Sequence, residues 1–191
     1  MANGEQQLKL GRKVVTFAAG KRGRTVGRGE CYDLADQALT HAGAKSALSY
    51  GKITDDADYE WGRRIELKDV EAGDILQLRD HKITIRTDTT IKKVFANGGS
   101  ETTDKWNEQD FKRGHHTAIV EVNKGNGVLE VYEQNVKPGG KKVQRHTLYV
   151  RKQTPTTKTE TRNEGKTRVT TTTTITITVE GTVWAYRPEA P

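Results

Sequence analysis

Apolar residues recur every three or four positions in the stretch that follows the glycine-rich run of residues 23–29. They are Leu34, Ala35, Ala38, Leu39 and Ala42. This period places them on one face of a helix. We predict that the helix begins near Cys31 and ends near Gly43, since glycine commonly follows the last helical turn. A shorter helix is predicted over residues 12–20.

Further along the chain the pattern changes to alternation of apolar and polar residues, which is typical of strands. The clearest case is a hairpin that joins residues 116–122 to residues 128–136 through the turn sequence NKGNG. Other predicted strands are a segment ending at Arg79, a hairpin over residues 82–95 and a strand over residues 143–153. Residues 96–114 and 154–164 are polar and are predicted to be loops.

A threonine-rich run occupies residues 167–188. Threonine and isoleucine alternate in it, which favours strand over helix. Such a run could also be a low-complexity stalk. The apolar residues along it favour a packed hairpin with its turn at Gly181; they are Ile175, Ile177, Val179, Val183 and Trp184. Helices followed by strands predict an α+β fold, with the N-terminal helices packed on one face of an antiparallel sheet.

Length, charge and composition indicate the size of the domain and the partners that it could bind. The 191 residues suit a single domain with a sizeable core, and 32% of them are hydrophobic. The net charge of +7 could steer the protein to nucleic acid, to anionic lipid or to an anionic cell wall, and does not choose among them. A nucleic-acid-binding β protein is disfavoured because aromatic residues make up only 6% of the chain and do not interleave with a basic stripe.

Targeting signals are not evident in the sequence. No apolar run is long enough to span a membrane. The N-terminus, MANGEQQLKLGRK, lacks the apolar core of a signal peptide. We therefore expect a protein that is cytoplasmic as synthesised.

The chain has one cysteine, Cys31, so it cannot form an internal disulfide. Cys31 lies where the predicted loop becomes a helix, and free backbone N–H groups with the helix dipole stabilise an anion there. A thiolate is such an anion, and its pKa falls further beside a histidine. The alternative is that Cys31 is a small buried apolar residue.

The hairpin of residues 114–135 carries the second candidate feature. Strand alternation places His116 on one face with Ala118, and Glu133 on one face with Asn135. A turn at residues 125–126 pairs His116 with Asn135 and Ala118 with Glu133, while a turn one residue later keeps the same faces. Polar residues at the end of an apolar stripe could simply mark where the sheet meets solvent. Three of them on one shared face, in a chain with one free cysteine, favour a site.

These residues are the set that a cysteine hydrolase needs. A thiolate attacks a carbonyl carbon, and a histidine takes the thiol proton and later protonates the leaving amine. A carboxylate or amide orients the imidazole, and backbone N–H groups at the nucleophile's helix form an oxyanion hole. We predict Cys31 as nucleophile, His116 as base and acid, and Glu133 and Asn135 as orienting residues. His115 is the rival base, but alternation sends it to the other face; the remaining histidines, at 41, 81 and 146, are predicted to lie on the surface.

The order of these motifs resembles the CHAP family of cysteine, histidine-dependent amidohydrolases and peptidases. The segments that carry the resemblance are GEC at residues 29–31, AGDIL at 72–76, HTAIVEV at 116–122 and VYEQN at 131–135. The family's cysteine falls on Cys31, its histidine on His116, and its Glu-x-Asn pair on Glu133 and Asn135. Gly29 and Glu30 fall on the oxyanion side of the site, with Glu30 where many members have glutamine.

The resemblance implies a papain-like core that cleaves peptide amide bonds, most often in peptidoglycan. It also implies that the segment at about residues 80–114 is an inserted hairpin with its loop, and that about residues 154–180 are a threonine-rich β extension of one domain spanning 1–191. No acidic cluster precedes Cys31, so we expect no metal and no cofactor; Asp55, Asp56 and Asp58 are expected to form a solvated loop. The expected partners are a peptide or peptidoglycan substrate and a protein bound by the extension. The expected place of action is the cell wall. The alternative function is a catalytically inactive papain-like binding module.

Overall fold

The computed structural model describes residues 2–54 and 56–191. The chain divides into two compact units. Unit 1 consists of residues 1–82, 112–151 and 180–191, and unit 2 consists of residues 83–111 and 152–179. Three long strands contribute to both units: β2 (Ile75–Val94), β3 (Ser100–Asn123) and β7 (Thr167–Arg187).

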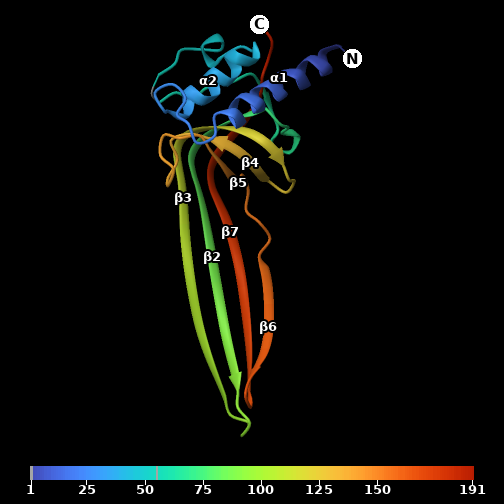
Figure 1. Ribbon diagram of the computed structural model, residues 1–191, viewed down its shortest axis with the longest axis vertical. Coiled ribbons are helices and arrows are strands. Elements are labelled where there is room, and N and C mark those ends of the chain that lie inside the picture. Colours follow the sequence, from blue (N-terminus) through green and yellow to red (C-terminus); the bar gives the residue numbers. More distant parts are fainter. Residues whose placement is uncertain (1, 55) are drawn as a thin grey trace. The chain divides into compact units, whose positions relative to one another are not determined.

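Unit 1 begins with two helices, α1 (Ala2–Gly20) and α2 (Cys31–Ala42), which pack on a sheet (Figure 1). The core joins the apolar face of each helix to side chains from four strands. These core residues include Leu10, Val14, Ala18, Leu34, Ala35, Ala38, Leu39, Ala42, Ile75, Ile119, Tyr132 and Tyr186. Helix α2 ends at Gly43, whose φ of 76° is the left-handed conformation that glycine adopts readily. The predicted start and end of this helix are therefore confirmed.

The remaining elements of unit 1 are short. They are the 3₁₀ turns η1 (Ala47–Ser49) and η2 (Leu67–Asp69) and the strands β1 (Arg63–Ile65), β4 (Val128–Glu133) and β5 (Gln144–Tyr149). The strand order across the sheet is β1-β7-β2-β3-β4-β5, and β1, β4 and β5 all pair antiparallel. Helices on an antiparallel sheet make this an α+β fold, as predicted.

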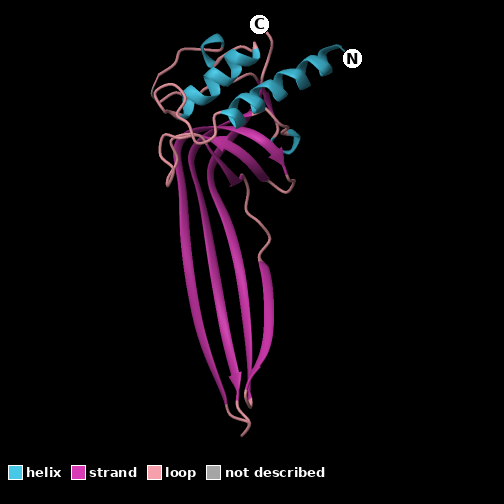
Figure 2. Cartoon of the chain, viewed as in Figure 1, coloured by secondary structure: helices cyan, strands magenta, loops and turns pink. Residues whose placement is uncertain are grey.

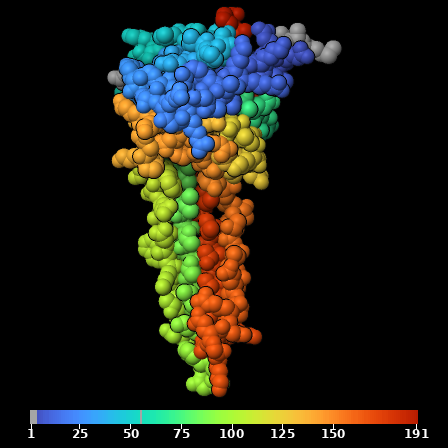
Figure 3. Space-filling model, in the orientation of Figure 1, coloured from blue at the N-terminus to red at the C-terminus, as the bar shows by residue number. Residues whose placement is uncertain are grey.

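Unit 2 is built only of strands. It contains the far segments of β2, β3 and β7 together with β6 (Thr156–Glu164), which pairs with β7 (Figure 2). Figure 3 shows these strands side by side, with no other element covering the face drawn. Of the residues in this unit, Ile83 and Val169 are buried, and the rest are half-buried or exposed.

Several predicted turns and loops lie inside these long strands. The hairpin expected over residues 82–95 is one continuous strand, β2, and the loop expected over 96–114 belongs mostly to β3. The loop expected over 154–164 is β6, which turns at Gly165. The strand prediction over residues 82–95 was right and only its turn was wrong. The two loop predictions were wrong because polar strands exposed on both faces carry no apolar alternation to distinguish them from loops.

Gly181 is not a turn either. It lies within β7 with φ of 88°, and a Cβ at this position would come within 2.3 Å of the backbone oxygen of Asp80. The glycine therefore allows β7 to pass close to the backbone of β2, which explains why a glycine interrupts this threonine-rich strand.

The register of the β3–β4 hairpin is confirmed at the end near His116. Ala118 pairs with Glu133, as predicted. A bulge between Val120 and Val122 then shifts the register, and it leaves Val122 42% exposed instead of on the apolar face. The predicted pairing of His116 with Asn135 does not form, because β4 ends at Glu133 and Asn135 has a left-handed φ of 64°.

Candidate active site

Cys31 is the first residue of α2 and is half-buried. The loop in front of it is held by the helix itself, since the carboxylate of Asp33 accepts the N–H of Arg28 at 2.7 Å and that of Glu30 at 3.3 Å. The backbone groups of Tyr32 and Thr117 donate hydrogen bonds to the Cys31 sulphur. The thiol is thus surrounded by donors that favour its anion.

His116 makes a side-chain hydrogen bond with Cys31. Burial alone would raise the pKa of the Cys31 thiol, but the hydrogen bond and the charge of His116 outweigh burial and lower it. Burial lowers the pKa of His116, but the hydrogen bond with Cys31 and the charges of Cys31 and Glu133 outweigh burial and raise it to about 9. Each shift favours the charged form of its group, the thiolate for Cys31 and the imidazolium for His116.

Glu133 lies on the other side of the imidazole. Its Oε2 is 3.2 Å from His116 Nε2, although the N–H is not aligned for a hydrogen bond, so the contact is an ion pair. With Nε2 facing this carboxylate, Nδ1 is the ring nitrogen left to face the thiol. The imidazole therefore bridges a thiol and a buried carboxylate.

Arg113 and His146 also contact Glu133, whose side chain is fully buried. Arg113 reaches both carboxylate oxygens, with 2.8 Å between its Nε and Oε2. His146 Nδ1 lies 2.8 Å from Oε1. Burial raises the pKa of Glu133, but its contacts with Arg113, His116 and His146 lower it well below its ordinary value. Glu133 is therefore ionised and is held in one orientation.

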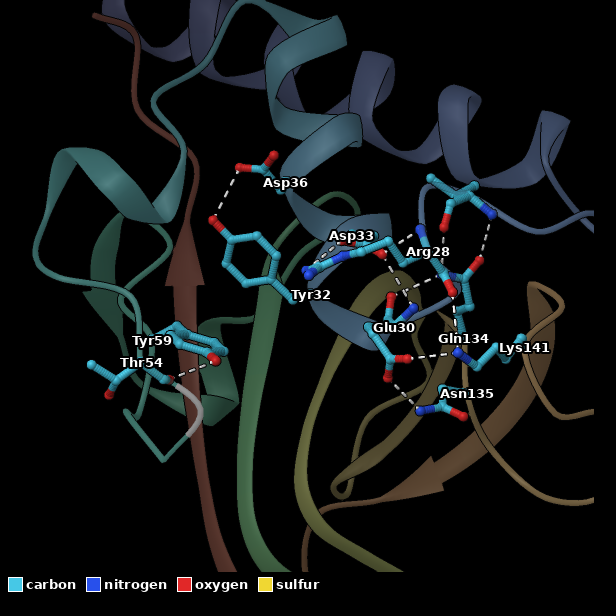
Figure 4. A network of polar contacts seen from close by, with 11 residues as sticks. Arg28, Glu30, Tyr32, Asp33, Asp36, Thr54, Tyr59, Gln134, Asn135 and Lys141 are labelled. Carbon is cyan, nitrogen blue, oxygen red and sulfur yellow. Dashed lines mark hydrogen bonds and ion pairs between the residues drawn. The ribbon is translucent and has the colours of Figure 1, made fainter.

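The two residues after Glu133 contact the loop that leads to Cys31 (Figure 4). Gln134 is fully buried and bonds to the backbone of Val26 and Glu30. Asn135 donates to the Glu30 carboxylate at 2.7 Å, and Lys141 forms an ion pair with the same carboxylate at 2.9 Å. The end of β4 thus contacts both His116 and the loop that leads to Cys31.

The structure brings together three of the four residues predicted to be catalytic: Cys31, His116 and Glu133. The described contacts of Asn135 are with Glu30 and not with the imidazole, since Asn135 leaves the strand face that Glu133 occupies. Gly29 and Glu30 lie in the loop directly before Cys31, and the Glu30 side chain is occupied by Asn135 and Lys141.

His115 lies elsewhere. Its Nε2 is 2.7 Å from the carbonyl oxygen of Ala57, and its ring is 5.2 Å from that of Tyr59. The two neighbouring histidines therefore have separate environments, and of the two, His116 is the one in contact with the thiol.

The sequence prediction missed Arg113, Gln134 and His146, and it placed His81 and His146 on the surface. His81 is 1% exposed and bonds to the carbonyl oxygen of Tyr149, while His146 contacts Glu133. Arg113 lies in a segment predicted to be a loop. His146 could have been found only from the register of β4 with β5, in which it lies opposite Val131, two residues before Glu133.

The described residues, 2–54 and 56–191, include no group of three or more His, Cys, Asp or Glu side chains arranged to hold a metal ion. In the same part of the chain, no helix is both long and apolar enough to cross a membrane. Asp55, one of the three acidic residues predicted to form a solvated loop, lies outside the described residues.

A cysteine at a helix start beside a histidine from a β-sheet is the arrangement of a papain-like cysteine proteinase fold. A family model described as the AIM3/BBC1 cysteine proteinase-fold domain matches residues 4–190, and the chain belongs to this family. The match supports the papain-like fold in general and not the CHAP family in particular. No curated protein and no solved structure was found to match the chain.

Proposed function

We propose that the protein is a cysteine hydrolase that cleaves peptide amide bonds through Cys31, His116 and Glu133. The observation that carries the proposal is the hydrogen-bonded Cys31–His116 pair, backed by a buried and ionised Glu133. A residue that served only as a small buried apolar group would need neither partner. A lowered thiol pKa beside a raised imidazole pKa is typical of an activated nucleophile.

The reaction proceeds in two steps. The Cys31 thiolate attacks the amide carbonyl carbon, a carbon–sulphur bond forms, and the carbonyl electron pair moves to oxygen. When this intermediate collapses, the carbon–nitrogen bond breaks and the His116 imidazolium protonates the departing amine. Neutral His116 then takes a proton from water, whose oxygen attacks the thioester carbon. The carbon–sulphur bond breaks, and the acid leaves with Cys31 as thiolate and His116 as imidazolium.

Glu133 serves His116 in both steps. Its negative charge stabilises the imidazolium, and its fixed position keeps Nδ1 towards the sulphur. Arg113 and His146 keep this carboxylate ionised although it is fully buried. In this proposal Asn135 does not orient the imidazole and instead supports the Glu30 side chain.

The CHAP-like order of motifs makes peptidoglycan peptides the first substrates to test. The net charge of +7 would favour adhesion to an anionic wall. The geometry of the pair itself requires only an amide carbonyl, so other peptides belong in the same test.

The test is hydrolysis of a peptide library and of peptidoglycan fragments by wild type and Cys31→Ala, followed by mass spectrometry. New termini that appear with wild type and not with Cys31→Ala support the proposal. It would be abandoned if both proteins left every peptide intact while Cys31 reacted with iodoacetamide no faster than a free thiol of ordinary pKa.

A second candidate function is a binding module that uses unit 2. The β6–β7 hairpin carries an open groove of about 310 Å³, lined by Thr156, Lys158, Glu160, Thr171, Thr173 and Ile175 among others. Substitution of Lys158 and Thr173 by aspartate should weaken binding of a protein partner and leave the reactivity of Cys31 unchanged. If wild type and this variant retained the partner equally well in a pull-down, the groove would not be the binding surface.

A further inference from the structure

Gln134 holds the peptide bond that precedes the nucleophile. Its side chain is fully buried, and its Oε1 accepts the N–H of Val26 at 2.7 Å. Its Nε2 donates to two carbonyl oxygens, that of Val26 at 3.0 Å and that of Glu30 at 2.8 Å. One amide side chain therefore fixes both ends of the loop from residue 26 to residue 30 (Figure 4).

The carbonyl of Glu30 belongs to the same peptide unit as the N–H of Cys31. A peptide unit is planar and trans, so its C=O and N–H point in opposite directions. The Glu30 oxygen is fixed by Gln134 Nε2 and also accepts the N–H of Asp33 at 3.1 Å. Fixing this oxygen fixes the direction of the Cys31 N–H.

The Cys31 N–H also makes no hydrogen bond within the helix. Cys31 is the first residue of α2, and the first N–H groups of a helix have no carbonyl partner within the helix. A donor attached to the nucleophile's own residue is well placed for the oxygen that becomes negative during attack. The direction of this N–H therefore matters for the intermediate and not for the thiolate itself.

We infer that Gln134 is a positioning residue that sets the direction of the Cys31 N–H as an oxyanion donor. The inference rests on the proposed hydrolase function. It also explains why Gln134 follows Glu133 directly: one strand end orients the base through residue 133 and the nucleophile's peptide through residue 134.

Two reagents distinguish an effect of Gln134 on the oxyanion donor from an effect on the reactivity of the thiol. Iodoacetamide alkylates the thiolate without an oxyanion, so its rate follows the thiolate. Acylation by p-nitrophenyl acetate passes through a tetrahedral oxyanion before p-nitrophenolate leaves with the bonding electron pair. Cys31 is the only cysteine, so peptide mass spectrometry assigns either product to one sulphur.

Gln134→Met keeps the length of the side chain and removes its hydrogen bonds. We expect acylation by p-nitrophenyl acetate to slow about 10- to 100-fold, somewhat less than the loss of an oxyanion donor outright. Alkylation by iodoacetamide should change by no more than about threefold, since the thiolate keeps His116. The matched control is Gln144→Met, which also removes an amide donor to a backbone carbonyl, that of Val136, and should leave both rates unchanged.

Equal slowing of both reactions, or none, would overturn the inference. Slow alkylation of the wild type would instead contradict the proposed function. Should Gln134→Met not fold, Gln134→Glu keeps the bond from Val26 N–H and directs a carboxylate at the two carbonyls, and the same ratio of rates applies. If neither variant folds, NMR of the wild type supplies the test. The resonance of the Cys31 amide proton must move downfield when N-acetyl-leucinal forms a hemithioacetal with Cys31. An unmoved resonance would show that this N–H is not an oxyanion donor.

Discussion

Unit 1 buries some of its charged side chains, whereas the described residues of unit 2 keep theirs exposed or half-buried. In unit 1, Arg113 and Glu133 are buried and bound to each other beside two histidines. In unit 2, the ion pairs Lys158–Glu160 and Arg162–Glu164 join residues two apart on an edge strand and are exposed to solvent. Water screens the second kind of pair, whereas the first kind interacts at low dielectric.

This difference indicates where chemistry can be expected. Buried charges that must be compensated shift each other's pKa values, and such shifts cluster at functional sites. Exposed pairs on a strand chiefly keep its edge soluble and discourage pairing with other strands. The proposed catalysis therefore belongs to unit 1, and we expect mutations in the two units to differ sharply in their effects.

The largest effect is expected for Cys31→Ala. Removing the nucleophile should lower kcat/KM by about 10⁴-fold or more. The fold should persist, because the residue lies at a helix start and is only half-buried. Turnover of a cleaved peptide measures the loss of activity, and far-ultraviolet circular dichroism shows whether the fold persists. A folded variant with wild-type turnover would show that Cys31 is not the nucleophile.

The next effect concerns two adjacent histidines. His116→Ala should lower kcat/KM by about 10²- to 10⁴-fold, the range for loss of a general acid–base. His115→Ala should retain most activity, because its ring contacts Ala57 and Tyr59 and not the thiol. Kinetics of both variants decide, and the reverse order of activities would show that the site has been assigned to the wrong histidine.

The sequence predicted the parts of the site that follow a local period. The helical period led to Cys31, and strand alternation with the pairing of Ala118 and Glu133 led to His116 and Glu133. Strand alternation and the family resemblance both pointed to Asn135 as well, but the left-handed backbone there turns it away from the strand face.

Residues that depend on long-range register were not predictable in this way. His146 approaches Glu133 from a third strand, and Arg113 comes from a segment without apolar alternation. Arg113 and His116 are an odd number of residues apart, so regular alternation would send them to opposite faces although both contact Glu133. The strands at residues 96–114 and 154–164 were missed for a related reason, since exposure on both faces removes the pattern that marks a strand.

Arg113→Met tests the buried charge itself. It leaves the buried Glu133 carboxylate without its bidentate partner, and the free energy of unfolding should fall by about 3–5 kcal/mol. Arg162→Met is the control, since Arg162 pairs with Glu164 on the exposed strand β6 and its loss should change stability little. Urea denaturation of both variants measures the difference, and equal losses would show that burial of the Arg113–Glu133 pair does not matter.

The pH dependence of kcat/KM should be bell-shaped. Activity falls as acid protonates Cys31, whose pKa is lowered by His116, and it falls again as His116 loses its proton near its raised pKa of about 9. Both limbs belong to the coupled pair. Glu133→Gln removes the anion that raises the pKa of His116, so the alkaline limb should move to lower pH; a limb that stayed in place or moved up would contradict the role given to Glu133.

The smallest effect is expected in unit 2. The hydroxyl groups of Thr159 and Thr172 lie 3.2 Å apart on adjacent strands, but both side chains belong to the solvated sheet. Thr159→Val keeps the branched shape that suits a strand and removes only this contact, so the free energy of unfolding should change by no more than about 0.5 kcal/mol. Val169→Ala, by contrast, removes two carbon atoms from a side chain that is 1% exposed, and should cost about 1–2 kcal/mol. If urea denaturation showed the threonine change to be the more costly, paired hydroxyls and not buried carbon would stabilise this unit, and the contrast drawn between the two units would fail.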